Sequence, residues 1–250
     1  MCRSVAFLSF RFGATDGVSV VARSWMRAFE ELGARVVTVT GSSTESTPFP
    51  GLVVPGLGMD DEVAAGVIEP HLRVALDGFD LVVVENLLTI PINLEASRAV
   101  AAVLAGRPAL LHHHDPPWHR ARYAHVTSLP STDPAWRHVA ITHLLAAELE
   151  ERGIRARTIH NAFERPPVRT ETERQAIRDR VRAAIGFARD ERVVAHPVRA
   201  IERKNIPGAI SLAEALDATY WLLGPAEEGY DEELAEQLRS ARCRVVHRVR

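Results

Sequence analysis

Hydrophobic residues occur along the chain in short bursts of strand length, and stretches of helical periodicity separate the bursts. The run at 80–85 is apolar at four consecutive positions, which is typical of a strand buried on both faces of a parallel sheet. The pattern predicts strands at 4–10, 35–40, 52–55, 80–85, 109–113, 138–142, 155–160, 192–198, 220–223 and 244–249.

Helical patterns fill the intervals between these strands. In the helix that follows the first strand, one stripe holds Val21, Trp25, Phe29 and Leu32. Gly33 is placed to end this helix. Further helices are expected at 60–76, 91–105, 144–152, 171–185, 207–216 and 231–240. Thr142 is suited to cap the helix at 144–152, and Gly153 to end it.

The alternation of strands and helices predicts an α/β fold whose parallel sheets are built from βαβ units. The pattern starts again after Pro166-Pro167. We therefore predict one domain over residues 1–165 and a second, smaller one over residues 166–250.

Composition and charge exclude several classes of function. The net charge of −2 favours no polyanionic partner, so we expect no nucleic-acid binding. Cys2 and Cys243 stand at opposite ends, which predicts neither a disulfide framework nor a zinc site and fits a reducing, cytoplasmic location. No apolar stretch approaches the roughly 20 residues that span a bilayer, so membrane contact would be peripheral at most.

Ligands of open parallel sheets bind at the carboxyl ends of strands, where loops meet helix N-termini. The loop after the first strand contains Gly13, Asp16 and Gly17. Glycines let backbone N–H groups approach an anion, and the helix dipole favours negative charge there. We expect this loop to contact a phosphate or another anionic group of a ligand. A plain turn between strand and helix explains the same residues.

A histidine-rich segment, residues 112–119, follows the strand at 109–113. Strand alternation sends His112 and His114 to one face and His113 to the other. Imidazole can hydrogen-bond a sugar hydroxyl or polarise a developing charge, so His114 and Asp115 are candidate catalytic residues. Two other interpretations stay open. The histidines could be packed strand residues, or a metal site could be formed by His112, His114, Asp115 and His119.

The loop at 199–205 follows the first strand of the second block and carries Arg199 and Lys204, the only lysine of the chain. Asn205 is a good N-cap, and Pro207 suits the first helical turn. The buried side of this helix is expected to hold Ile206, Ile210 and Ala213. Two cations would therefore flank a helix N-terminus, an arrangement that suits a diphosphate. A solvated basic loop is the alternative.

The loop that follows the strand at 220–223 contains Gly224. Its position after a parallel strand predicts contact with a base or ribose, so Gly224 is a further candidate for nucleotide binding. A simple turn explains the loop equally well.

Taken in order, these motifs resemble the GT-B glycosyltransferases of family 4, which are retaining enzymes that use nucleotide-sugar donors. Gly13–Gly17 stands where that family has a glycine-rich loop below the donor diphosphate and near the acceptor, and His114-Asp115 matches its His-Asp at a strand end. Arg199 and Lys204 match the Arg and Lys that hold the donor diphosphate. The resemblance covers nearly the whole chain and implies two Rossmann-like domains, an acceptor-side domain followed by a donor domain.

The chain departs from the family pattern at several places. Asn205 stands where glycine is usual, although asparagine tolerates a left-handed conformation. Ala162 likewise replaces a usual glycine after Asn161. The family carries two glutamates separated by seven residues in a later element, and the sequence reaches Arg250 before such an element. The resemblance therefore implies that the second domain is incomplete.

The resemblance implies metal-independent transfer of a hexose from a nucleotide-diphosphate sugar, with retention and without a cofactor. The acceptor would be a glycan, a lipid or a small molecule. Two alternatives remain: a non-catalytic module that binds nucleotides or sugar phosphates and needs a missing segment or partner, and a metal-dependent hydrolase built on the histidines. We expect the first domain to close over the donor phosphates.

Overall fold

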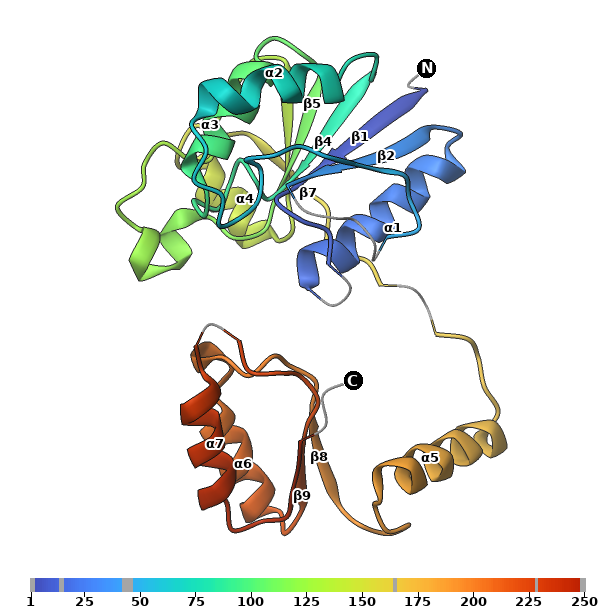
Figure 1. Ribbon diagram of the computed structural model, residues 1–250. Helices are drawn as coiled ribbons and strands as arrows, with labels where there is room; N and C mark the ends of the chain where they lie inside the picture. The colour runs from blue at the N-terminus through green and yellow to red at the C-terminus, as the bar shows by residue number, and fades with distance from the viewer. Residues whose placement is uncertain (1–2, 14–15, 42–46, 164–165, 228, 248–250) are drawn as a thin grey trace. The chain divides into compact units, whose positions relative to one another are not determined.

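The computed structural model describes residues 3–13, 16–41, 47–163, 166–227 and 229–247 (Figure 1). The chain divides into two compact units, Met1–Arg165 and Pro166–Arg250, so the division falls at the double proline. None of the helices among the described residues is long and apolar enough to cross a membrane.

The first unit is built on a parallel sheet of seven strands in the order β3-β2-β1-β4-β5-β6-β7. The strands are β1 (Ser4–Leu8), β2 (Arg35–Thr40), β3 (Gly51–Val53), β4 (Leu81–Glu85), β5 (Ala109–His113), β6 (Trp136–Ala140) and β7 (Ala156–Thr158). The order reverses between β1 and β4, which creates the topological switch point where ligands of such sheets bind. The predicted parallel α/β fold is confirmed.

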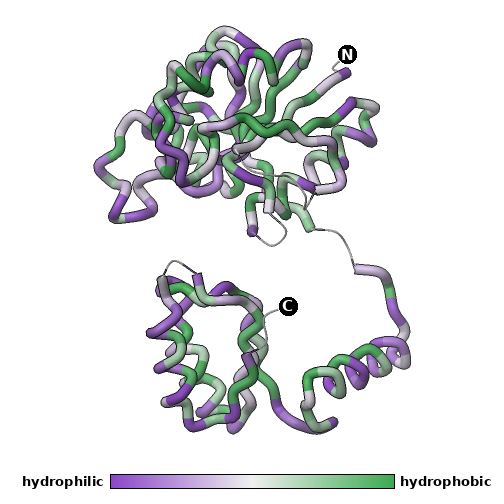
Figure 2. Tube along the Cα trace, viewed as in Figure 1, coloured by the Kyte–Doolittle hydropathy of each residue, from purple (hydrophilic) through white to green (hydrophobic). Residues whose placement is uncertain are grey.

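Helices cover both faces of this sheet. They are α1 (Gly17–Glu31), α2 (Ala65–Ala75), α3 (Leu94–Leu104) and α4 (His143–Glu150). The face that carries Val5, Phe7 and Val83 packs against α1, and the opposite face packs against α2 and α3. In Figure 2 the central strands are green along most of their length, as expected for strands covered on both faces.

The predicted stripe of α1 is partly wrong. Ala22 and Met26 are fully buried, whereas Leu32 is 73% exposed. Leu32 follows the last residue of α1, and Gly33 takes φ +85°, so Leu32 does not lie on the buried face of the helix. Gly33 therefore ends the helix as predicted.

Several boundaries differ from the sequence expectation for local reasons. β6 begins two residues early because Trp136 pairs with Ala109 of β5. It ends before Thr142, whose side chain caps α4 by accepting a hydrogen bond from Leu145 N, as predicted. α2 begins only at Ala65, and Asp61 before it binds the backbone of the preceding loop. Cys2 and the last part of the strand expected at 244–249 lie outside the described residues.

The second unit has a parallel sheet of three strands in the order β10-β9-β8. Its elements are α5 (Glu171–Ile185), β8 (Val193–His196), α6 (Ile206–Ala215), β9 (Thr219–Leu222), α7 (Asp231–Ser240) and β10 (Val245–His247). One face of the sheet, with Tyr220 and Leu222, packs against α6 and α7 in a single apolar cluster. A short 3-10 turn, Glu202–Lys204, precedes α6.

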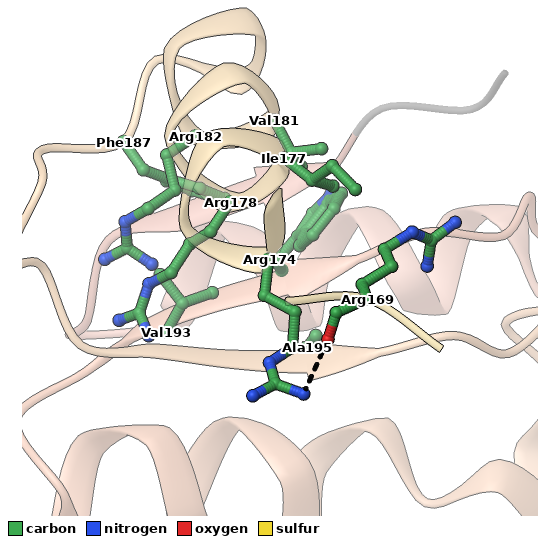
Figure 3. A pocket seen from close by; sticks show the side chains of 10 residues that line it. Arg169, Arg174, Ile177, Arg178, Val181, Arg182, Phe187, Val193 and Ala195 are labelled. Carbon is green, nitrogen blue, oxygen red and sulfur yellow. Dashed lines mark hydrogen bonds between the residues drawn. The ribbon is translucent and has the colours of Figure 1, made fainter. Parts of the chain in front are cut away.

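The other face of this sheet forms a cavity of about 400 Å³ beneath α5 (Figure 3). Val193, Ala195 and Trp221 point into it from the strands, opposite to the face that α6 covers. Four arginines border it: Arg169, Arg174, Arg178 and Arg182. None of the residues predicted to bind donor lines this cavity.

Candidate functional site

The first unit gathers polar side chains at the carboxyl ends of β4 and β5. Glu85 lies opposite His112 in the register of the two strands. Glu85 Oε2 lies 3.0 Å from His112 Nδ1 and 3.3 Å from His114 Nε2. Glu85 and His112 are fully buried, and only 6% of the His114 side chain is exposed. We call these three residues the Glu85 cluster.

Local electrostatics keep the Glu85 carboxylate ionised. Burial raises its pKa, but the hydrogen bonds and charges of His112 and His114 lower it, and the net shift of the pKa is downward. The Trp25 ring packs on His112 with ring centroids 4.5 Å apart, which places the Glu85 cluster beneath α1. Glu85 is also next to the switch point, since Ser9 Oγ after β1 donates to the Glu85 carbonyl.

Asn86 holds the backbone that carries the predicted catalytic pair. Its Oδ1 accepts hydrogen bonds from His114 N at 3.1 Å and Asp115 N at 3.0 Å, and its Nδ2 donates to Asp115 Oδ2. Asn86 takes φ +60°, a left-handed conformation that asparagine tolerates. The second Asp115 oxygen pairs with Arg120 at 2.8 Å. His114 and Asp115 are therefore fixed by the end of β4.

His113 points to the opposite face, as strand alternation predicts. Its Nδ1 lies 2.6 Å from Thr89 Oγ1, and its Nε2 lies 2.9 Å from His138 Nδ1. Burial lowers the pKa of His113 well below the ordinary value, and the charges of His138, His112 and His114 act in the same direction. His113 is a neutral, hydrogen-bonded core residue.

The four residues predicted as alternative metal ligands do not come together in the described part of the chain. His119 Nε2 binds Glu148 at 2.7 Å, and Asp115 is held by Asn86 and Arg120. The structure instead brings in Glu85, whose ligand atom lies within 4.8 Å of those of His112 and His114. One carboxylate and two imidazoles form a set that zinc accepts.

His112 and His114 also pack on each other, with ring centroids 4.4 Å apart and the rings tilted by 60°. Both histidines contact the same Glu85 oxygen at hydrogen-bond distance.

The loop between β1 and α1 is closed by its own side chains. Asp16 caps α1 by accepting hydrogen bonds from Ser19 N at 3.0 Å and Ser19 Oγ at 2.6 Å. Gly13 N donates to Ser19 Oγ at 2.8 Å, and Gly17 is the first residue of α1. The Asp16 carboxylate thus takes the place at the helix N-terminus that an anion would use. Residues 14 and 15 of this loop lie outside the described residues.

In the second unit, Asn205 has the role expected for it. It takes φ +51°, and its Oδ1 accepts from Gly208 N at 3.1 Å as the N-cap of α6. Pro207 stands in the first turn. The predicted buried residues Ile206, Ile210 and Ala213 are all buried. The N-terminus of α6 therefore opens directly after the basic turn.

The two cations beside this helix differ in their partners. Arg199 Nη1 pairs with Glu227 Oε2 at 2.5 Å, and both side chains are partly exposed. Within the described part of the chain, Lys204 forms no ion pair. Burial and, after it, the charge of Lys204 lower the pKa of His196 at the end of β8. Arg199 is thus paired with a carboxylate of the protein, whereas Lys204 has no such partner among the described residues.

Gly224 lies where backbone packs on backbone. A Cβ there would meet the carbonyl oxygen of Val198 at 2.2 Å, so only glycine fits. The neighbouring loop is joined to the basic loop by an isolated bridge between Ala200 and Ala226. The loops after β8 and β9 are therefore held side by side by backbone contacts.

Sequence reasoning missed Glu85, Asn86 and Glu227. A signal was present for the first two, because a charged residue directly after four apolar ones marks the end of a buried strand. Glu227 had no such signal, since its partner Arg199 is 28 residues away in the chain.

No protein-family model matches the chain, and no curated protein matches it in sequence. Solved structures do match over nearly the whole chain. HepE from Anabaena, in complex with UDP and glucose, is 18% identical at a TM-score of 0.65, covering 98% of this chain and 69% of HepE. The chain has the GT-B fold.

Two further GT-B structures are similar to the same extent. WaaG, a glycosyltransferase involved in lipopolysaccharide biosynthesis, is 15% identical at a TM-score of 0.64, covering 98% of this chain and 70% of WaaG. A glycosyltransferase from Rickettsia africae is 10% identical at a TM-score of 0.65, covering 99% and 68% of the two chains. In this fold the seven-stranded and three-stranded sheets are two Rossmann-like units.

Proposed function

We propose that the chain is a retaining glycosyltransferase of the family 4 type, which transfers a hexose from a nucleotide-diphosphate sugar to an acceptor. The observation that supports this most is the anion site of the second unit. There the N-terminus of α6 opens beside Lys204 and Arg199, at the carboxyl end of β8. A helix N-terminus and two cations suit a diphosphate better than any neutral ligand.

In this proposal the donor diphosphate is bound by Lys204, Arg199 and the first N–H groups of α6, with Asn205 and Gly224 shaping the loops. These groups stabilise the negative charge that develops on the leaving diphosphate as the sugar–phosphate bond breaks. Because they supply that charge, the reaction needs neither a metal nor a cofactor. Arg199 pairs with Glu227 through one guanidinium nitrogen, so its remaining N–H groups can donate to the phosphate.

The residues of the first unit have separate roles in the proposal. His114 orients the donor sugar, and Asp115, held by Asn86 and Arg120, fixes the turn that carries it. The loop with Gly13, Asp16 and Gly17 contacts the acceptor rather than the phosphates, because Asp16 already occupies the N-terminus of α1. A glycan, a lipid at a membrane surface or a small molecule could be that acceptor.

Calorimetry with UDP, GDP and ADP tests the anion site. We expect Lys204→Ala and Arg199→Ala each to weaken nucleotide binding by about 1–3 kcal/mol. Arg203→Ala is the matched control, since Arg203 is exposed in the same turn and should leave the affinity unchanged. Equal affinities of all three variants would contradict the proposal.

Turnover separates the two alternatives from this proposal. Release of UDP from UDP-glucose by this chain supports an enzyme, whereas tight nucleotide binding without turnover supports the non-catalytic module. The metal-dependent hydrolase requires that EDTA abolish activity.

A further inference from the structure

The Glu85 cluster contains one acceptor group that faces two imidazoles. An ionised carboxylate has lone pairs and no hydrogen, so it can only accept hydrogen bonds. Glu85 Oε2 lies within hydrogen-bond distance of His112 Nδ1 and His114 Nε2. Both nitrogens must therefore carry a hydrogen and donate to the same oxygen.

When both imidazoles are neutral, as at a pH well above the ordinary histidine pKa, this arrangement gives the two histidines opposite tautomers. A neutral imidazole has one N–H group, so a hydrogen on Nδ1 leaves Nε2 bare, and the reverse holds. His112 then carries its hydrogen on Nδ1, and its buried Nε2 has no hydrogen-bond partner among the described residues. His114 carries its hydrogen on Nε2, which leaves Nδ1 as the nitrogen that can accept a hydrogen bond.

We propose that Glu85 is a positioning residue that fixes the ring orientation and tautomer of His114, so that Nδ1 accepts a hydrogen bond from a hydroxyl of the donor sugar. This inference rests on the proposed function for the identity of the ligand, but not for the state of the imidazole. The Asn86 side chain fixes the backbone of His114 from the same strand end, so ring and backbone are both held by β4.

The state of the imidazoles is measured on the protein without ligand. At pH 8.5 in EDTA, two-bond ¹H–¹⁵N correlation spectra should show the Nε2–H tautomer for His114. They should show the Nδ1–H tautomer, which is disfavoured in free histidine, for His112. In Glu85→Leu, His112 should return to the Nε2–H form. The inference is overturned if His112 shows the Nε2–H form in the unmodified protein, or if Glu85→Leu leaves both tautomers unchanged.

A second variant and a matched control keep the test decisive. If Glu85→Leu does not fold, Glu85→Met keeps the length of the side chain without the carboxylate, and it should likewise return His112 to the Nε2–H form. Glu148→Gln removes a carboxylate that binds His119 at the surface. It should leave His112 and His114 unchanged. If one equivalent of Zn²⁺ replaces both N–H groups with metal-bound nitrogens, the cluster is a metal site and the inference is wrong.

A binding measurement distinguishes failure of this inference from failure of the proposed function. Glu85→Leu, or Glu85→Met in its place, should bind UDP as the unmodified protein does, because UDP reaches only the anion site. It should lose about tenfold in affinity for UDP-glucose, about 1.4 kcal/mol. If the unmodified protein does not bind UDP, the proposed function is contradicted, while the tautomer result is unaffected. An unchanged ratio of UDP-glucose to UDP affinity would overturn the role of Glu85.

Discussion

The two polar sites of this chain both lie at the carboxyl ends of parallel strands, yet they handle charge in opposite ways. In the first unit the Glu85 carboxylate is fully buried and receives hydrogen bonds from His112 and His114. In the second unit, Lys204 and the N-terminus of α6 pair with no carboxylate among the described residues, and Arg199 shares a partly exposed ion pair. A buried charge must be satisfied by the protein itself, whereas a site for a charged ligand must keep part of its charge uncommitted.

The first prediction compares the two carboxylates directly. Glu85→Ala leaves two buried imidazole N–H groups without an acceptor, and we expect it to lower the free energy of unfolding by about 3 kcal/mol. Glu227→Ala removes only a partly exposed partner of Arg199 and should cost less than about 1 kcal/mol. Urea unfolding followed by circular dichroism measures both. Equal losses of unfolding free energy in the two variants would contradict the expected difference between the buried and the partly exposed carboxylate.

Two left-handed asparagines sharpen the comparison further. Asn86 is buried and makes three hydrogen bonds, so Asn86→Ala should cost about 2 kcal/mol. Asn205 caps α6 at the surface, and Asn205→Ala should cost about 1 kcal/mol. Glycine adopts a positive φ without strain, so replacing Asn by Gly instead of Ala avoids the backbone part of the stability loss at either position. The remaining loss comes from the side-chain hydrogen bonds, of which Asn86 makes three and Asn205 one. Glycine should therefore recover more of the loss at Asn205 than at Asn86. The same unfolding assay tests this order, and a larger recovery at Asn86 would contradict it.

Salt should affect the two sites differently. Screening acts on the partly exposed cations around Lys204, so raising the ionic strength from 50 mM to 500 mM should weaken UDP binding roughly fivefold. The buried Glu85 network should keep the unfolding free energy of the first unit nearly constant over the same range. Calorimetry and urea unfolding at both salt concentrations provide the check. Salt-independent UDP binding would argue against an electrostatic site.

The smallest effect concerns Tyr220 beneath the basic loop. Burial raises the pKa of Tyr220 to about 12, and its hydroxyl lies 2.9 Å from His196 Nδ1. The folded protein therefore keeps this proton where the unfolded chain, with a pKa of about 10, loses it. Stability should fall as the pH rises from about 10 toward 12, and Tyr220→Phe should remove this contribution. In an ultraviolet titration of the tyrosines, the step at the highest pH should be absent in the Tyr220→Phe variant.

Local patterns in the sequence were sufficient for the elements and for several caps. Continuous apolar runs predicted the buried strands, and Asn205 and Thr142 were recognisable as N-caps because a capping side chain acts within three residues of itself. The alternation of His112, His113 and His114 was predicted for the same reason, since strand geometry has a period of two. The sequence by itself determined these features because each depends on neighbours in the chain.

Tertiary structure decided which side chains share a site. Glu85 meets His112 only because β4 and β5 are adjacent in the sheet, 27 residues apart in the chain. Packing also determines that Leu32 is exposed. It places Asp115 beside Arg120 and His119 beside Glu148, apart from His112 and His114. The pairing of Arg199 with Glu227 depends on two loops joined by a single bridge. Such contacts follow from strand order and register, which no local pattern of residues encodes.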